Sequence, residues 1–160
     1  MNPDDIRDGL KAYAPIEKRW QIEKVGDYQV INDAYNANPD SMKAALATVL
    51  ELYPKATLVL GNMGELGTDE EFYHQEIGNF IIGKLTENND IRVITVGNLA
   101  KKIAEKVAEN GIPTASFENN CQATRYILDN VEKHSTIFLK ASRSMKFEEI
   151  LNELKGEISW

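Results

Sequence analysis

Polar and charged side chains gather in three short segments, each of which follows an apolar run and precedes a helical pattern. They are residues 32–41 (Asn-Asp-Ala-Tyr-Asn-Ala-Asn-Pro-Asp-Ser), 61–70 (Gly-Asn-Met-Gly-Glu-Leu-Gly-Thr-Asp-Glu) and 140–144 (Lys-Ala-Ser-Arg-Ser). In open α/β sheets, ligands bind outside the carboxyl ends of the strands. The sequence therefore predicts that a binding site, if present, lies in these three loops.

The first segment has side chains that suit a nucleoside. Asp33 can accept two hydrogen bonds from vicinal hydroxyls such as those of a ribose, and Asn36 and Asn38 each carry a donor and an acceptor for the edge of a purine. Tyr35 adds a flat apolar face. The alternative is that Asn38 caps a helix, Pro39 is its first residue and the others only form a turn. Spacing alone does not decide between these interpretations.

The last segment combines cations with hydroxyls. Lys140 and Arg143 accompany Ser142 and Ser144 between a buried strand and a helix. Cations and free backbone amides at a helix N-terminus bind carboxylates or phosphates. The alternative is that Ser144 caps the helix and both cations are solvated. The clustering of the cations favours the anion site.

The middle segment is a glycine loop whose spacing matches neither a Walker phosphate loop nor a Gly-x-Gly-x-x-Gly fingerprint. Glu65 could orient a neighbour, and His74 in the following helix could face the same cleft. A solvated carboxylate and a structural histidine are the common alternatives. Cys121 has no second Cys or nearby His at metal spacing, and no metal ligand is predicted in this chain.

Apolar runs alternate with amphipathic segments along the chain. Two strands joined through Gly26-Asp27 should form an antiparallel hairpin. The other continuous apolar strands, separated by helices, predict a largely parallel sheet covered on both faces. We expect a three-layer α/β domain with one antiparallel edge strand. The predicted strands are 19–25, 28–33, 56–60, 91–96, 114–117 and 136–139, and the predicted helices are 39–52, 70–86, 99–109, 121–131 and 145–154, with a further helix after Asn2.

Composition excludes several classes of function. A length of 160 residues fits one domain, and a net charge of −7 argues against a nucleic-acid binder. A single cysteine allows no internal disulfide, which favours a reducing cytoplasm. No apolar run approaches the roughly 20 residues that cross a bilayer, and the acidic start Met1-Asn2-Pro3-Asp4-Asp5 is unlike a signal peptide.

Several motifs, in order, resemble the C-terminal domain of the Mur ligase family, and within it the MurF ligases. The most specific is Asp33-Ala-Tyr-Asn-Ala-Asn-Pro-Asp-Ser-Met42, followed by Gly61-Asn-Met with Glu65-Leu-Gly, by His74 with Gly78, and by Lys140-Ala-Ser-Arg-Ser-Met145. Asn32, Ala34, Asn62 and Ala141 depart from the residues usual in that family. The change at Ala141 matters most, because a glycine there would let the backbone turn tightly or approach a ligand.

The resemblance implies a three-domain, cytoplasmic, monomeric ligase with a Rossmann-like C-terminal domain at residues 15–160. Residues 1–14 would end the connection to a central domain. In this family, ATP phosphorylates the carboxylate of UDP-muramoyl-tripeptide, and the amine of D-Ala-D-Ala attacks the acyl phosphate. The central domain holds the phosphate loop and the magnesium ligands, so this chain alone should be inactive.

The resemblance also assigns residues to the two sites. Asp33 would bind the ribose, Tyr35, Asn36 and Asn38 would lie near adenine, and Arg19 would reach the phosphates. Lys140, Ser142 and Arg143 would line the site of the dipeptide.

Three rival classes are weaker. A stand-alone Rossmann-like nucleotide module would have a glycine-rich first turn, where this chain is rich in asparagine. A receiver-like or flavodoxin-like interaction domain would need an acidic cluster that the sequence does not supply. A ligase for another amino acid, or a folylpolyglutamate synthase, is disfavoured by the order Tyr35-Asn-Ala-Asn-Pro39.

Overall fold

A six-stranded sheet organises the chain. The computed structural model describes residues 20–156, so the predicted helix after Asn2, the junction at residues 14 and 15, and Arg19 lie outside the described residues. Across the sheet the strand order is β1-β2-β6-β3-β4-β5. The strands are β1 (Gln21–Val25), β2 (Tyr28–Asn32), β3 (Ala56–Gly61), β4 (Arg92–Val96), β5 (Thr114–Phe117) and β6 (Thr136–Lys140).

The predicted hairpin and the predicted parallel sheet are both confirmed. β1 pairs with β2 antiparallel, with Val25 opposite Tyr28 across the turn. Gly26 in this turn has a φ of +58°, and a Cβ there would lie 2.9 Å from the carbonyl oxygen of Leu154, so both conformation and space favour glycine. All other neighbouring strands are parallel.

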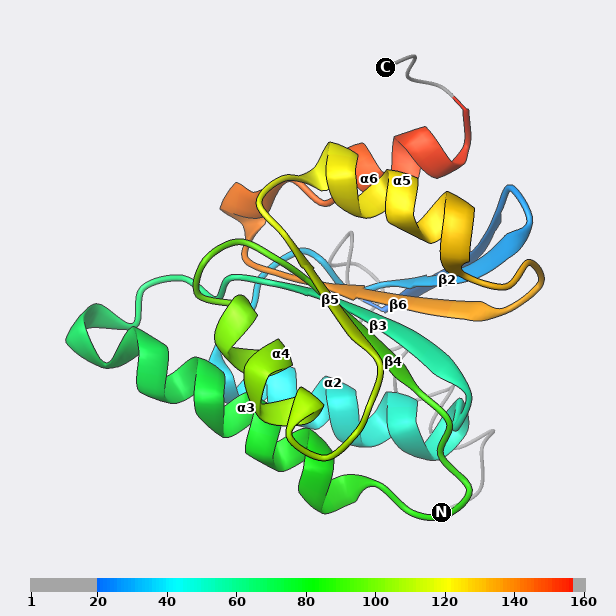
Figure 1. Ribbon diagram of the computed structural model, residues 1–160. Helices are drawn as coiled ribbons and strands as arrows, with labels where there is room; N and C mark the ends of the chain where they lie inside the picture. The colour runs from blue at the N-terminus through cyan, green and yellow to red at the C-terminus, as the bar shows by residue number, and fades with distance from the viewer. Residues whose placement is uncertain (1–19, 157–160) are drawn as a thin grey trace.

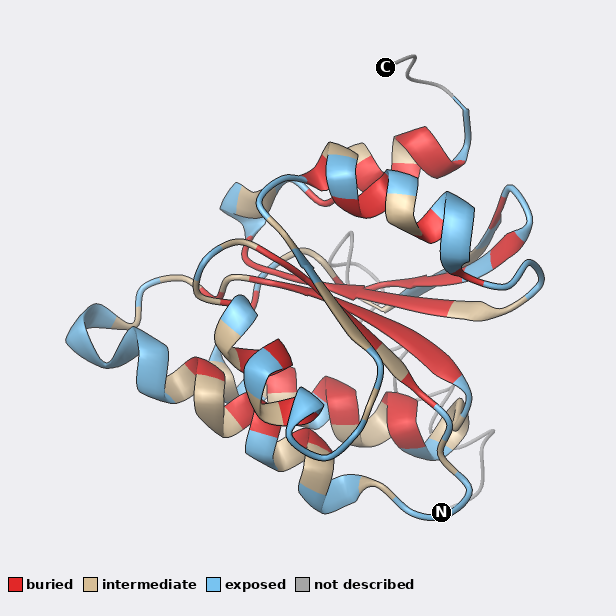
Figure 2. Cartoon of the chain, viewed as in Figure 1, coloured by how far each residue is buried: buried red, intermediate tan, exposed pale blue. Residues whose placement is uncertain are grey.

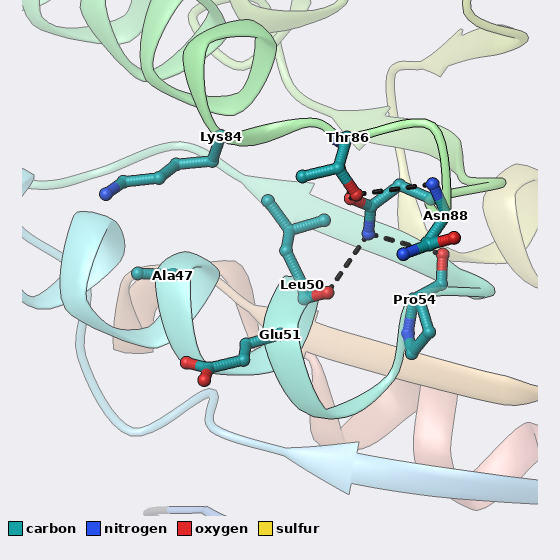
Figure 3. Close-up of a pocket in the computed structure, with 8 residues that line it drawn as sticks. Ala47, Leu50, Glu51, Pro54, Lys84, Thr86 and Asn88 are labelled. Atoms are coloured by element: carbon teal, nitrogen blue, oxygen red, sulfur yellow. Dashed lines mark hydrogen bonds between the residues drawn. The ribbon is translucent and has the colours of Figure 1, made fainter.

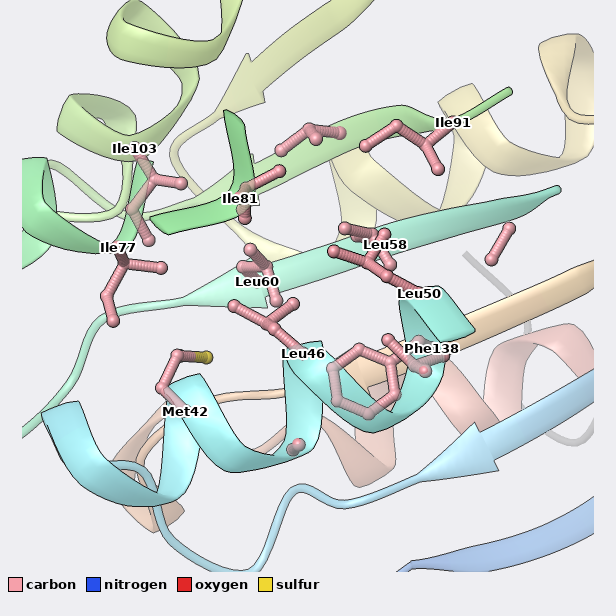
Figure 4. Packing of buried hydrophobic residues seen from close by; sticks show 14 of the residues in the cluster. Met42, Leu46, Leu50, Leu58, Leu60, Ile77, Ile81, Ile91, Ile103 and Phe138 are labelled. Carbon is pink, nitrogen blue, oxygen red and sulfur yellow. The ribbon is translucent and has the colours of Figure 1, made fainter. Parts of the chain in front are cut away.

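Helices cover both faces of the sheet (Figure 1), as predicted for a three-layer α/β domain. One face carries α2 (Pro39–Leu52), α3 (Glu70–Lys84) and α4 (Lys101–Ala108), and the other carries α5 (Asn120–Asn130) and α6 (Glu148–Leu154). Burial is concentrated in the strands and in the helix surfaces that face them (Figure 2). Figure 4 shows the first of the two cores, in which Met42 and Leu46 of α2 pack near Leu60 of β3 and Phe138 of β6.

The direction of the crossovers explains which helix lies on which face. Right-handed connections are the rule between parallel strands. α2, α3 and α4 carry the chain in one direction, from β2 to β3, β4 and β5, and they share a face. α5 returns the chain from β5 to β6 and therefore lies on the opposite face. The loops after β2 and β3 consequently leave toward one face, whereas the loop after β6, between them, leaves toward the other.

The first helix follows from its sequence, and the last one begins later than predicted. Asn38 and Ser41 form a capping box at the start of α2, with Pro39 in its first turn. The prediction that the last helix begins at Met145 was wrong, because residues 143–145 form a 3₁₀ turn and α6 begins at Glu148. Lys146 is left-handed, with a φ of 54°, and interrupts the helix between them.

Gly61, at the end of β3, is required by close packing on the α5–α6 face. A Cβ there would lie 2.6 Å from Cβ of Ala141 and 2.8 Å from Cζ of Phe147. Both neighbours are fully buried. The side chain at residue 141 therefore occupies space that a larger residue at 61 would need.

Gly61→Ala is expected to lower the free energy of unfolding by about 1–3 kcal/mol through overpacking. Gly83→Ala is the matched control, because nothing lies within 4 Å of a Cβ built there, in an exposed turn of α3. It should raise the free energy of unfolding by up to about 1 kcal/mol through helix propensity. Urea denaturation of both variants measures the difference, and equal stability of the two would contradict the packing argument.

Candidate nucleotide and substrate site

A buried ion pair joins the ends of β2 and β6. Nζ of Lys140 lies 2.9 Å from Oδ2 of Asp33. The parallel register pairs Asn32 with Leu139, and the Asp33 amide donates to the Leu139 carbonyl at 2.9 Å, so the next residues along, 33 and 140, lie side by side. Side chains alternate across a strand, and these two therefore share the face of Ile31 and Phe138, toward α2. The lysine side chain is only 3% exposed.

The same ammonium group also holds the loop that follows Asp33. It donates to the carbonyl oxygen of Asn36 at 3.1 Å and, more weakly, to that of Asp33 at 3.5 Å. A buried charge is tolerated only when it is paired and hydrogen-bonded, and both conditions are met here. Lys140 thus fixes the backbone of residues 33–36. We call residues 33–38 the nucleotide loop.

Within the nucleotide loop, the two asparagines predicted as ligands are exposed and hydrogen-bonded to the backbone. The Asn36 side chain is exposed, and its Oδ1 accepts the amide of Ala37 at 2.9 Å. Asn38 is also exposed, but its Oδ1 accepts the amide of Ser41 at 2.9 Å, which confirms that it is the helix cap. Tyr35 is half-buried. Both asparagine side chains are therefore exposed, and each has its Oδ1 engaged by a backbone amide.

Residues 140–144, which we call the basic loop, reach toward the nucleotide loop from β6. The guanidinium carbon of Arg143 lies 5.7 Å from the ring centroid of Tyr35, within cation–π range. Arg143 is exposed, whereas Ser142 is buried and its Oγ lies 3.0 Å from Oγ of Ser144. Ser144 does not cap α6, contrary to one alternative from the sequence. Arg143 and Ser144 thus lie at the surface, whereas Lys140 is buried.

Ala141 is compatible with the turn in the basic loop. Its methyl group is fully buried in the core beneath α5 and α6, and its φ is not positive. The backbone at this position needs no left-handed conformation. The alanine that stands in place of the resembled family's glycine is thus accommodated by the small residue opposite it, Gly61.

Asn62 accepts two hydrogen bonds, which connect the glycine loop to the loops after β4 and β6. The Asn62 carbonyl accepts the amide of Ser142 at 2.9 Å, and its Oδ1 accepts the amide of Ala100 at 2.8 Å. The side chain lies over Gly97, where a Cβ would be 2.4 Å from Oδ1. The loops after β3, β4 and β6 are therefore connected at their bases.

His74 is fully buried beneath the glycine loop, and both of its ring nitrogens are engaged. Nε2 accepts the amide of Met63 at 2.9 Å, and Nδ1 lies 2.6 Å from the carbonyl of Glu70. This pattern requires the neutral ring with its proton on Nδ1. Burial lowers the pKa of His74, and the Glu70 carbonyl and carboxylate oppose that shift. The placement favours a structural role, whereas Glu65 is exposed in the loop above with a φ of 58°.

Sequence reasoning missed Asn120, which binds the segment just beyond the basic loop. Its Nδ2 donates to the carbonyls of Met145 at 2.8 Å and Lys146 at 3.1 Å, and to Oε2 of Glu149 at 3.1 Å. The pair Asn119-Asn120 offered a signal, because only one of two successive asparagines can cap a helix. Asn119 is the cap of α5, and the side chain of Asn120 is left to bind residues 145 and 146.

The opposite edge of the sheet has a pocket of about 400 Å³ beside the end of α2 (Figure 3). Within it Nδ2 of Asn89 donates to the carbonyls of Leu50 at 3.0 Å and Pro54 at 3.4 Å, which ends α2. Among residues 20–156, no cluster of three or more His, Cys, Asp or Glu side chains could hold a metal ion. No helix in that part of the chain is long and apolar enough to cross a membrane.

Comparison with known proteins identifies the family. The profile of the Mur ligase, glutamate ligase domain matches residues 18–143. The chain is 38% identical over 157 residues to a UDP-N-acetylmuramoyl-tripeptide–D-alanyl-D-alanine ligase of Bacillus subtilis (strain 168), covering 95% of this chain and 34% of that protein. It is 29% identical to the protein of that name from Escherichia coli (strain K12), over 95% of this chain and 32% of the relative.

Solved structures with the same fold include MurF from Acinetobacter baumannii, with a TM-score of 0.75 and 24% identity over 98% of this chain and 34% of that one. MurF ligase from Thermotoga maritima in complex with ADP gives a TM-score of 0.69 and 20% identity over 89% of this chain and 31% of that one. This chain belongs to the family of Mur ligase C-terminal (glutamate ligase) domains. It spans about a third of the length of the curated relatives it matches.

The buried, neutral state of His74 predicts a pH dependence of stability. Because its pKa in the folded chain is below the unperturbed value of 6.5, the unfolded chain binds the proton more readily. The contribution of His74 is therefore complete above that value and is lost as the pH falls below it. When the pH is lowered from about 7.5 to about 5.5, the free energy of unfolding should fall less in His74→Gln than in the parent chain.

His134→Asn is the matched control, since His134 is exposed and its φ of 67° is one that asparagine tolerates. Denaturation with urea at the two pH values measures the effect. The control should keep the pH dependence of the parent chain. An identical pH dependence in His74→Gln would show that the ring is not held neutral.

Proposed function

We propose that this chain is the C-terminal domain of an ATP-dependent ligase that joins D-alanyl-D-alanine to UDP-N-acetylmuramoyl-tripeptide. One observation carries the proposal: a loop suited to a nucleoside and a loop suited to an anion meet at the switch point of a Mur ligase domain. The names of relatives that match 95% of the chain supply the reaction.

The nucleotide loop would bind the ATP nucleoside. Lys140 occupies Oδ2 of Asp33, so Oδ1 is the oxygen to accept a ribose hydroxyl. The exposed amide of Asn36 would meet the adenine edge, with Asn38 and Tyr35 beside it. Arg19 would reach the phosphates. The MurF ligase from Thermotoga maritima was solved in complex with ADP, which supports a nucleotide as a ligand of the complete protein.

The basic loop would bind the incoming dipeptide. Arg143 is an exposed cation next to hydroxyl groups, and the carboxylate of D-Ala-D-Ala needs such a partner. Ser142 and Lys140, which the family resemblance also assigns to this site, are buried. Glu65, which is exposed in the glycine loop, would line the same cleft. The two loops would bring the amine and the nucleotide together.

The remaining chemistry belongs to the rest of such a ligase. ATP would phosphorylate the carboxylate of the tripeptide, and the dipeptide amine would displace the phosphate. The triphosphate and magnesium would be held by a central domain. We propose that the complete protein is a cytoplasmic monomer whose partners are these small substrates, and that it binds neither nucleic acid nor membrane.

The complete ligase is expected to release phosphate from ATP only when UDP-muramoyl-tripeptide and D-Ala-D-Ala are both present. The 160-residue chain alone should release none above background, because its loops do not match a triphosphate-binding motif. A phosphate-release assay with D-Ala-D-Ala, D-glutamate or L-glutamate as the amine separates this ligase from others of the superfamily. Preference for a glutamate would contradict the proposal.

Arg143→Ala in the complete ligase is expected to raise the KM for D-Ala-D-Ala. A charged hydrogen bond contributes roughly 1.5–3 kcal/mol, so the increase should be about tenfold to a hundredfold. The KM for ATP should change much less. Arg125→Ala is the control, because Arg125 is an exposed arginine on α5. A shift confined to ATP would remove the dipeptide from this loop and leave the ligase activity standing.

A further inference from the structure

We infer that Lys140 is a positioning residue that locks the nucleotide loop to the basic loop, and that its ammonium group does not itself bind substrate. The inference rests on the proposed function for the identity of the two ligands. It differs from the expectation that Lys140 lines the dipeptide site.

The first argument is the number of donors. An ammonium group has three hydrogens, and Lys140 directs them to three acceptors of the nucleotide loop. These are Oδ2 of Asp33 at 2.9 Å, the carbonyl of Asn36 at 3.1 Å and the carbonyl of Asp33 at 3.5 Å. No further hydrogen is left to donate to the carboxylate of a ligand. The 3% exposure of the side chain leads to the same conclusion.

The second argument is what the contact with Asn36 achieves. The carbonyl of Asn36 is held from beneath, while its side chain remains exposed. The bond therefore fixes the backbone from which the exposed side-chain amide of Asn36 projects. The same bond satisfies a further proton of the buried ammonium group, so the loop backbone and the charge are held by one contact.

The third argument is that the two loops touch twice. Lys140 joins them at the base, and Arg143 lies over the ring of Tyr35 nearer the surface. Lys140 is the last residue of β6, two positions before Ser142, whose amide is fixed by Asn62. A displacement of the nucleotide loop should therefore also displace the basic loop. Losing the ammonium group should disturb both sites together.

The test uses the complete ligase with Lys140→Met, which keeps the length of the side chain and removes its charge and donors. The KM for ATP and the KM for D-Ala-D-Ala should both rise, each by about tenfold or more. Lys140→Arg retains the charge and should recover part of the loss for both substrates. Lys133→Met is the control, because Lys133 is an exposed lysine that pairs with Asp27 at the opposite edge of the sheet.

Three results would overturn the inference. An increase confined to the KM for D-Ala-D-Ala would mean that the ammonium group binds the dipeptide. A lower Tm with both KM values unchanged would mean that Lys140 only stabilises the fold. Failure of Lys140→Arg to recover either KM, in a folded protein, would mean that the charge is not what positions the loops.

A double variant covers the case in which Lys140→Met does not fold. Asp33→Asn with Lys140→Met removes both charges and leaves no unpaired buried ion. Because the Asn36 carbonyl then also loses its donor, the double variant should show a higher KM for ATP than Asp33→Asn alone. A folded double variant with the same KM for ATP as Asp33→Asn would show that the bond to Asn36 positions nothing, and would overturn the inference.

The wild-type ligase separates this inference from the proposed function. Absence of activity with D-Ala-D-Ala would reject the proposed amine substrate, and calorimetric titration with ATP would then test Lys140 alone. In that titration Lys140→Met should weaken ATP binding about tenfold or more, and Lys133→Met should not. Equal ATP affinity in Lys140→Met, or no ATP binding by the wild type, would overturn the inference.

Discussion

A positive charge buried at the end of the central strand β6 constrains the whole carboxyl edge of this domain. Lys140 has almost no access to water, so its charge must be neutralised by a neighbour within the fold. The adjacent strand β2 runs in the same direction and ends at the same level, and it supplies that neighbour with Asp33. The strand order that places β6 between β2 and β3 is therefore a condition for the ion pair. That order also makes this edge a switch point, where ligands bind in sheets of this kind.

Much of the fold was predictable because its signals are local. Continuous apolar runs marked the parallel strands, Gly26-Asp27 marked the hairpin, and Asn38-Pro39 marked the start of α2. The start of α6 was predicted wrongly because it depends on a contact with a residue far away in the sequence. The side chain of Asn120, on α5, binds the carbonyls of Met145 and Lys146 and holds the chain out of a helix there. No pattern within residues 140–154 reveals that contact.

In the site, too, the local features were predictable and the contacts between distant residues were not. The rule for parallel sheets selected the three loops, and the residue types suggested a nucleoside and an anion. That Asp33 and Lys140 are partners could not be read from the sequence, because they are 107 positions apart and were assigned to different ligands. His74 was also ambiguous. Its pattern on the helix did not show that the amide of Met63 would meet one nitrogen and the Glu70 carbonyl the other.

The three loops are cross-linked at their bases and exposed at their tips. Lys140 fixes Asn36, Asn62 fixes Ser142, and His74 fixes Met63, all through backbone groups. The side chains of Asn36, Glu65 and Arg143 project to solvent above this rigid layer. Groups held in this way lose little conformational entropy when a ligand arrives, which strengthens binding. In the proposed ligase, the domain would therefore approach its substrates as a rigid body, because rearranging one loop would break backbone bonds in the next.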